Sequence, residues 1–180
     1  MNIRRVVTGH DENGKAIIVS DGQPINANDF EHSPGMHVAL LWRTEPNATV
    51  GKSVTDATGS VLNWTPLPGG TQAMLTIFPP DSVMMDPHFN PMAAGRELME
   101  KMPGLAEKFE MDAPGFHTVD TVDYGIILDG ELILELDDGS MTVMHKHDVI
   151  IQNGTRHAWR NQTEKPVPVL FVLTGAKREG

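Results

Sequence analysis

The chain has 180 residues, enough for one domain with a hydrophobic core of its own. It contains no cysteine, which excludes disulfides and thiolate metal ligands, and its formal net charge of -10 comes without a lysine or arginine cluster that could follow a nucleic-acid backbone. No apolar run approaches the roughly 20 residues of a membrane span, and the N-terminal sequence has no signal-peptide pattern. We therefore expect a soluble cytoplasmic protein without nucleic-acid or membrane partners.

Strand patterns dominate the chain from its first residues. IRRVV and KAIIVS flank TGHDENG, whose Asn13-Gly14 pair favours a hairpin turn. HVALLWRTE and TQAMLTIFPP predict two more strands, and further short strands follow from residue 117 onward: VDYGIIL, ELILELDD, MTVMHKH, DVIIQ, HAWRN and PVLFVLT. In ELILELD the leucines alternate with charged residues, as in a strand with one buried face. This series predicts an all-β sandwich or barrel.

One segment between these groups of strands has a helical pattern. NPMAAGRELMEKMPGLAEKFE opens with Asn90-Pro91, a favourable helix start, and is interrupted at Pro103-Gly104. Its Met and Leu side chains could form a lid over a ligand, but a stripe at helical spacing is more typical of packing against a core. We expect one or two short helices over 91–110, on the outside of the β-structure.

Three polar residues, His117, Asp123 and His157, are expected to point into the barrel. His117, Val119, Thr121 and Asp123 would share one strand face, and His157 lies on another short strand just after a glycine-containing turn. Two imidazoles and one carboxylate inside a barrel form the set that holds a divalent metal such as Fe, Mn, Ni or Zn with open coordination positions. The alternative is that His117 and Asp123 only hydrogen-bond across a polar barrel mouth.

Residues 115–174 resemble the conserved barrel of the cupin superfamily, whose first motif carries a His-x-His pair, a glutamate and a closing glycine. With Gly130 as that glycine, Asp123 takes the glutamate position, His117 takes the first histidine position, and Val119 replaces the second histidine. The resemblance therefore implies a metal set of three ligands, His117, Asp123 and His157, instead of the usual four.

The second motif is kept in part, because Gly154, His157 and Asn161 retain its Gly-x-x-His-x-x-x-Asn spacing. The resemblance implies a cupin-type double-stranded β-helix, or jelly-roll, barrel with extra N-terminal strands and a short helical insert. It covers a single domain over 1–180, with the N-terminal strands and hairpin in 1–90, the insert in 91–110 and the barrel motifs in 115–174.

For function, the resemblance implies a metal-dependent enzyme, an oxidoreductase or a lyase, acting on a small oxygenated or aromatic organic acid. Dioxygenation, decarboxylation and isomerisation all fit a metal with open positions. Two alternatives stay open: a non-catalytic small-molecule binding protein, and a metal-free polyketide-type cyclase or dehydratase using His117, Asp123 and His157 as acid and base.

Several neighbours complete the expected site. The substrate pocket is predicted from residues that share the inward faces or precede the insert: Val119, Thr121, Trp159, Asn161 and His88.

Three other polar residues are weaker candidates. Asp120 would replace Asp123 as the carboxylate ligand if the strand were bulged. His145 and His147 are expected to face solvent.

The early strands leave sheet edges that need a partner. Because unpaired edges are commonly covered by a second subunit, we expect a homodimer in which segment 1–20 adds to a sheet edge of its own chain or of the partner.

Overall fold

The computed structural model describes residues 2–51, 54–59 and 63–179. The strands in this part of the chain are β1 (Arg5–His10), β2 (Ala16–Gly22), β3 (Asn26–Asp29), β4 (His37–Thr44), β5 (Thr71–Phe78), β6 (Thr121–Ile127), β7 (Glu131–Leu136), β8 (Met141–His145), β9 (Val149–Asn153), β10 (His157–Arg160) and β11 (Val167–Gly175). The helical elements are η1 (Asp81–Val83), α1 (Pro91–Lys101) and η2 (Ala106–Lys108). Each strand and the helical insert predicted from the sequence is present.

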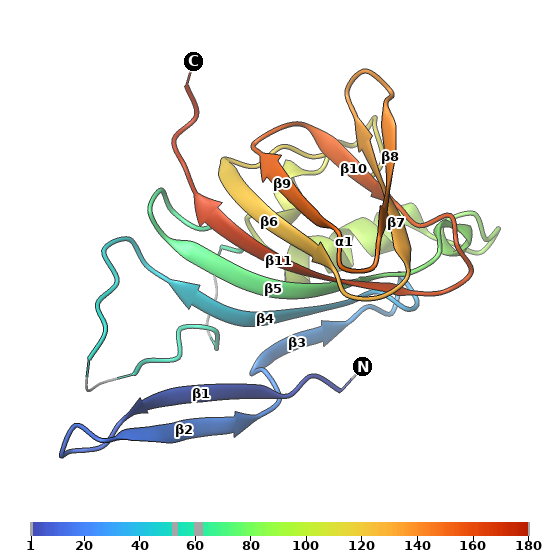
Figure 1. Cartoon of the computed structure of the whole chain (residues 1–180). Helices are drawn as coiled ribbons and strands as arrows, with labels where there is room; N and C mark the ends of the chain where they lie inside the picture. Colours follow the sequence, from blue (N-terminus) through green and yellow to red (C-terminus); the bar gives the residue numbers. More distant parts are fainter. Residues whose placement is uncertain (1, 52–53, 60–62, 180) are drawn as a thin grey trace.

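The strands form a large and a small sheet that together make a barrel (Figure 1). The large sheet has the order β3-β4-β5-β11-β6-β9 and the small one the order β10-β7-β8, while β1 and β2 form a hairpin sheet of their own. All of these strand pairs are antiparallel. The predicted all-β, cupin-type barrel is confirmed.

Strand alternation sets the inner face of the barrel. Along β11, Val169, Phe171 and Leu173 are buried, whereas the residues between them are partly exposed. Along β6, Thr121 and Asp123 are buried and Tyr124 is 48% exposed. The period of two that the sequence shows therefore places the carboxylate of Asp123 inside the barrel.

The turn between β6 and β7 depends on Gly130. Its φ angle is +77°, in the left-handed region that side chains with a Cβ rarely adopt. A Cβ at this position would also lie 3.2 Å from Cγ2 of Val167. The glycine that closes the first motif in the sequence is thus required by backbone geometry.

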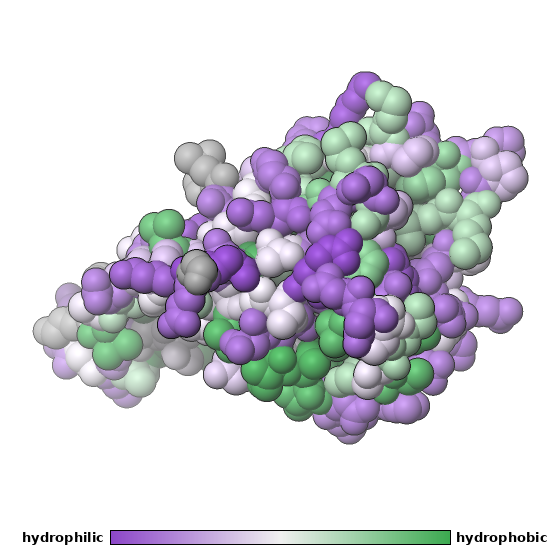
Figure 2. All heavy atoms as spheres, turned by 90° about the horizontal axis from the view of Figure 1, so that it is seen from above, coloured by the Kyte–Doolittle hydropathy of each residue, from purple (hydrophilic) through white to green (hydrophobic). Residues whose placement is uncertain are grey.

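The N-terminal hairpin is fastened to the barrel at one end. The buried guanidinium of Arg5 donates to the Leu41 carbonyl at 3.1 Å and pairs with Asp56. By contrast, β2 is exposed along its whole length, and Ile18 is 61% exposed. Hydrophobic atoms also show in several clusters on the largely hydrophilic face seen from above (Figure 2).

The helical insert lies behind the barrel in Figure 1. Asn90 caps α1, because its side chain accepts the backbone N–H of Ala93 at 3.1 Å, and Pro91 stands in the first turn. Glu97 of α1 is buried, and its carboxylate accepts the backbone N–H groups of Glu31 and His32 at 2.8 Å each. None of the helices in the described residues is long and apolar enough to cross a membrane.

Candidate functional site

A cavity of about 300 Å³ opens inside the barrel. Its walls come from both sheets and from the insert, with mostly apolar side chains that include Met74, Phe78, Trp159, Phe171, Leu98, Met102, Leu105 and Phe109. The insert was expected to pack on the outside of the β-structure, and this expectation is wrong in one respect: five residues of the insert with side chains line the cavity. Helical periodicity identifies the apolar face of a helix, but it does not say whether that face meets a core or a hollow.

Two histidines lie together in this cavity wall. The rings of His117 and His157 have centroids 4.3 Å apart at an interplanar angle of 50°. Their backbones hold them there, because each N–H donates to the carbonyl of the other residue, at 3.0 and 3.1 Å. This pair of bonds joins the segment before β6 to the start of β10, so the sequence-predicted histidines meet across two sheets.

The hydrogen bonds of the two rings assign their tautomers. Nδ1 of His117 lies 3.2 Å from the Gly115 carbonyl, and Nδ1 of His157 lies 3.0 Å from the Thr155 carbonyl. Since a carbonyl oxygen only accepts, Nδ1 carries the proton in both rings, and Nε2 is then an acceptor in the neutral form. Burial, and then the charge of His157, lower the pKa of His117 to about 4. Burial also lowers the pKa of His157, so both rings are neutral near pH 7.

Asp123 contributes a carboxylate to the same cavity. It is 8% exposed, and its Oδ1 atom has no hydrogen-bond partner among the described residues. Burial raises the pKa of this carboxyl to about 6, because the charged form loses its hydration. The cavity is therefore lined by three acceptors, two imidazole nitrogens and one carboxylate.

This donor set suits a divalent metal in kind. Two neutral imidazoles and a carboxylate with an unpaired oxygen are the ligand types that bind Fe, Mn, Ni or Zn. Across residues 2–51, 54–59 and 63–179, no three His, Asp or Glu side chains stand close enough together to hold an ion. The side chains of His117, Asp123 and His157 thus line one cavity without closing on one point.

Some of the expected pocket residues line the cavity and others do not. Val119, Trp159 and Asn161 line the cavity, whereas Thr121 is buried beside it and is not among the lining residues. His88 does not line the cavity, and its predicted place in the pocket does not match its position in the structure. It stands in an exposed turn, in which its backbone N–H donates to the Asp86 carboxylate at 2.7 Å.

Asn161 has a structural role within that wall. Its side-chain amide donates to the carbonyls of Phe78 at 3.0 Å and Lys165 at 2.8 Å, and its Oδ1 accepts from Thr163. The second-motif asparagine therefore holds β10 against the end of β5.

The weaker candidates point away from the cavity. Asp120 is exposed and pairs with Arg178 at 2.5 Å, and β6, which begins at the next residue, pairs with β11 and β9 without a register shift. His145 and His147 are exposed as expected, and neither lines the cavity.

Thr76 and Phe109 are among the cavity residues that were not identified from the sequence. Thr76 lines the cavity, and its hydroxyl is buried without a hydrogen-bond partner in the described part of the chain; the ring of Phe109 stacks on His117 with centroids 4.4 Å apart. A polar residue at an inward position of TQAMLTIF is a signal for Thr76, because Gln72, Met74 and Thr76 share that face. Nothing in the sequence around Phe109 indicates the stacking.

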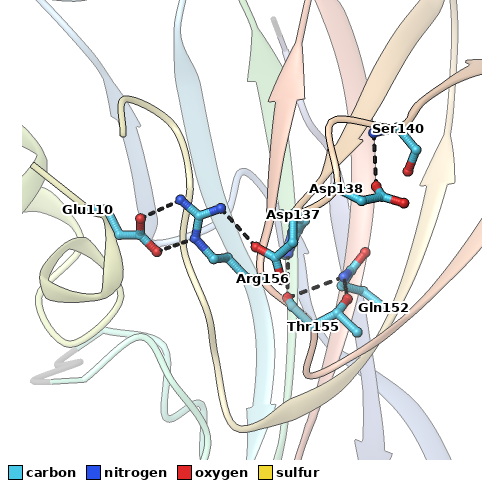
Figure 3. A network of polar contacts seen from close by, with 8 residues as sticks. Glu110, Asp137, Asp138, Ser140, Gln152, Thr155 and Arg156 are labelled. Carbon is cyan, nitrogen blue, oxygen red and sulfur yellow. Dashed lines mark hydrogen bonds and ion pairs between the residues drawn. The ribbon is translucent and has the colours of Figure 1, made fainter. Parts of the chain in front are cut away.

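A polar network fixes the end of the insert to the barrel (Figure 3). The guanidinium of Arg156 binds both carboxylate oxygens of Glu110, at 2.7 and 2.6 Å, and Asp137 at 2.8 Å. It also lies over the ring of Phe116, 3.9 Å from the centroid. The segment that carries Phe109 and leads into His117 is thereby held against β7 and β10.

The chain is similar in sequence to several known proteins. No family model matches the chain. Phomopsin biosynthesis cluster protein C' of Diaporthe leptostromiformis is 27% identical over 180 residues, covering 96% of this chain and 78% of that protein. A cupin-domain-containing oxidoreductase of Neurospora crassa is 41% identical over 64 residues, 34% of this chain and 33% of that protein.

Among solved structures, the cupin domain of Cnp3 from Schizosaccharomyces pombe is 11% identical, covers 97% of this chain and 89% of that chain, and has a TM-score of 0.48. The cupin-type fold rests on the jelly-roll barrel and on the motif residues from His117 to Gly130 and from Gly154 to Asn161. The chain thus has a cupin-type barrel, and over 34% of its length it is similar in sequence to a protein named a cupin-domain-containing oxidoreductase.

Proposed function

We propose that this protein is a metal-dependent oxidoreductase acting on a small organic molecule, with His117, Asp123 and His157 as the metal ligands. The observation that supports the proposal is the presence of three acceptor groups on the wall of one buried cavity. The reaction class comes from relatives that are named cupin-domain-containing oxidoreductases.

Backbone carbonyls orient two of the three proposed ligands. The bonds from Nδ1 to the Gly115 and Thr155 carbonyls orient the rings of His117 and His157 and keep the Nε2 lone pairs available. Burial keeps both rings neutral, so that no ring proton competes with the ion near pH 7. A bound metal would supply Lewis acidity, or a redox centre, to a substrate oxygen in the cavity.

Asp123 provides the negative charge that offsets part of the ion's charge. Because its pKa is raised to about 6, a proton occupies the carboxylate below that pH. Metal affinity should therefore rise as the pH increases through about 6 and level off above it.

The test is metal binding measured with a matched pair of variants. We expect protein purified without added metal to carry roughly one equivalent of Fe, Mn, Ni or Zn by elemental analysis. In calorimetric titrations, Asp123→Asn should weaken binding by at least 10- to 100-fold, the usual cost of disturbing a ligand shell. Asp120→Asn removes an exposed carboxylate three residues away and should leave binding unchanged.

Two results would contradict the proposal. If the wild-type protein takes up none of these metals, the cavity would instead belong to a non-catalytic binding protein or a metal-free enzyme. Loss of metal in Asp120→Asn with retention in Asp123→Asn would show that the ligand set is wrong.

A further inference from the structure

We infer that the cavity takes a neutral, elongated and mostly apolar molecule that presents a hydroxyl group, such as a phenol with an alkyl chain, to His117, His157 and Asp123. The inference deepens the proposed function, on which it rests, by naming the substrate class of the same cavity. It differs from the organic acid expected from the sequence.

The apolar character of this molecule is inferred from the rest of the cavity wall. The charged groups there are already paired: Asp81 accepts the N–H of Asn161 at 3.0 Å, and Arg160 donates to Glu135 at 2.7 Å and to the Pro114 carbonyl at 2.9 Å. Among the described lining residues, no unpaired lysine or arginine offers a site for a phosphate or carboxylate. A sugar or nucleotide would lose its hydration against Met and aromatic side chains without replacement.

The hydroxyl follows from the polarity of the other end. In the rings of His117 and His157 the acceptor is Nε2, because the Nδ1 protons are bound to carbonyls, and Asp123 lines the same cavity with a carboxylate. Three acceptors match a group that brings a donor. A hydroxyl brings one, whereas an ionised carboxylate brings only further acceptors and a second negative charge beside Asp123.

The length follows from the register of the large sheet. Asp123 stands opposite Leu173, which stands opposite Gln72, and Thr76 lies on the same face of β5 as Gln72. Two strand spacings of about 4.8 Å and four residues of about 3.3 Å separate Asp123 from Thr76, which gives roughly 16 Å along the sheet. Since both residues line the cavity, a ligand held at Asp123 has room for a chain that extends toward Thr76.

The experiment measures binding to metal-free full-length protein at pH 8, with tryptophan fluorescence and calorimetry. The probes are 4-heptylphenol, phenol and 4-heptylbenzoate, which separate the contributions of chain, hydroxyl and charge. Each buried methylene strengthens binding by up to about fourfold. We therefore expect 4-heptylphenol to bind at least 100-fold more tightly than phenol and at least 10-fold more tightly than 4-heptylbenzoate.

Variants identify the atoms responsible. Asp123→Asn removes the charge and adds a donor, so it should strengthen 4-heptylbenzoate binding at least 10-fold, while Asp120→Asn should change nothing. Equal affinity of wild-type protein for the phenol and the benzoate, or no gain from the heptyl chain, would overturn the inference. Because the protein is metal-free, these results are independent of metal uptake: metal binding without the ligand preference refutes the substrate class alone, and the preference without metal binding refutes the proposed function alone.

Discussion

Asp123→Asn should stabilise the metal-free protein, although Asp123 is proposed to be a metal ligand. The pKa of this buried carboxyl lies at about 6 in the folded chain and near its ordinary value of 3.8 in the unfolded chain. Each pH unit by which a pKa moves corresponds to about 1.4 kcal/mol, so ionised Asp123 costs the fold about 3 kcal/mol above pH 6. Between pH 4 and 6 the folded protein holds a proton that the unfolded chain releases. The contribution of Asp123 to stability therefore falls as the pH rises through this window.

The neutral amide of asparagine keeps the shape of the side chain and removes the buried charge. Part of the gain is lost because an amide at this position also lacks partners, and we expect a net stabilisation of about 1–3 kcal/mol at pH 8. Urea unfolding of metal-free protein, repeated from pH 4 to pH 8, measures the difference between variant and wild type. This difference should be largest at pH 8 and shrink toward pH 4, and exposed Asp120→Asn should show neither effect. A variant that is less stable than wild type at pH 8 would refute the reasoning.

Three other predictions concern the histidine, the insert and the hairpin. The pKa of His117 is lowered to about 4, so the contribution of His117 to stability should fall as the pH falls from 6.5 to 4, opposite to that of Asp123, and His117→Asn should remove this contribution from the unfolding profile. Arg156→Leu should increase amide hydrogen exchange over residues 109–116 by removing the contacts with Glu110 and Asp137, whereas loss of the exposed Arg178 pair should leave that segment protected. Light scattering should give about twice the chain mass of 19.7 kDa, because β2 exposes Ile17, Ile18 and Val19, and Ile18→Lys should weaken the dimer; a monomer at every concentration contradicts this.

The strand pattern of the sequence predicted most of the barrel, because buried apolar and exposed polar residues alternate along a strand with one buried face. Val119, Thr121 and Asp123 are buried, and Asp120 and Tyr124 are exposed, in the order that the period of two requires. The hairpin around Asn13-Gly14 and the glycine at 130 were equally readable, since both reflect local backbone geometry.

The composition of the cavity could not be predicted in the same way. Which insert residues reach the cavity depends on how α1 and η2 dock, and docking is a tertiary property that a helical stripe does not encode. His88 was placed in the pocket because it precedes the insert, but the turn at Asp86 directs it to solvent. Thr76 and Phe109 gain their importance only from the cavity that forms around them.

The insert also has a consequence for how this barrel could diversify. The insert, residues 91–110, lies within the connection from Phe78 at the end of β5 to Thr121 at the start of β6, and both strands pair with the same neighbour, β11. The ends of this connection are therefore fixed by the sheet, and for a flexible loop the entropy of closing such an excursion changes only slowly with its length. Insertions, deletions or exchanges within residues 91–110 could remodel one wall of the cavity while the strand register and His117 stay the same. Swapping this insert between relatives offers a direct route to new ligand preferences on an unchanged scaffold.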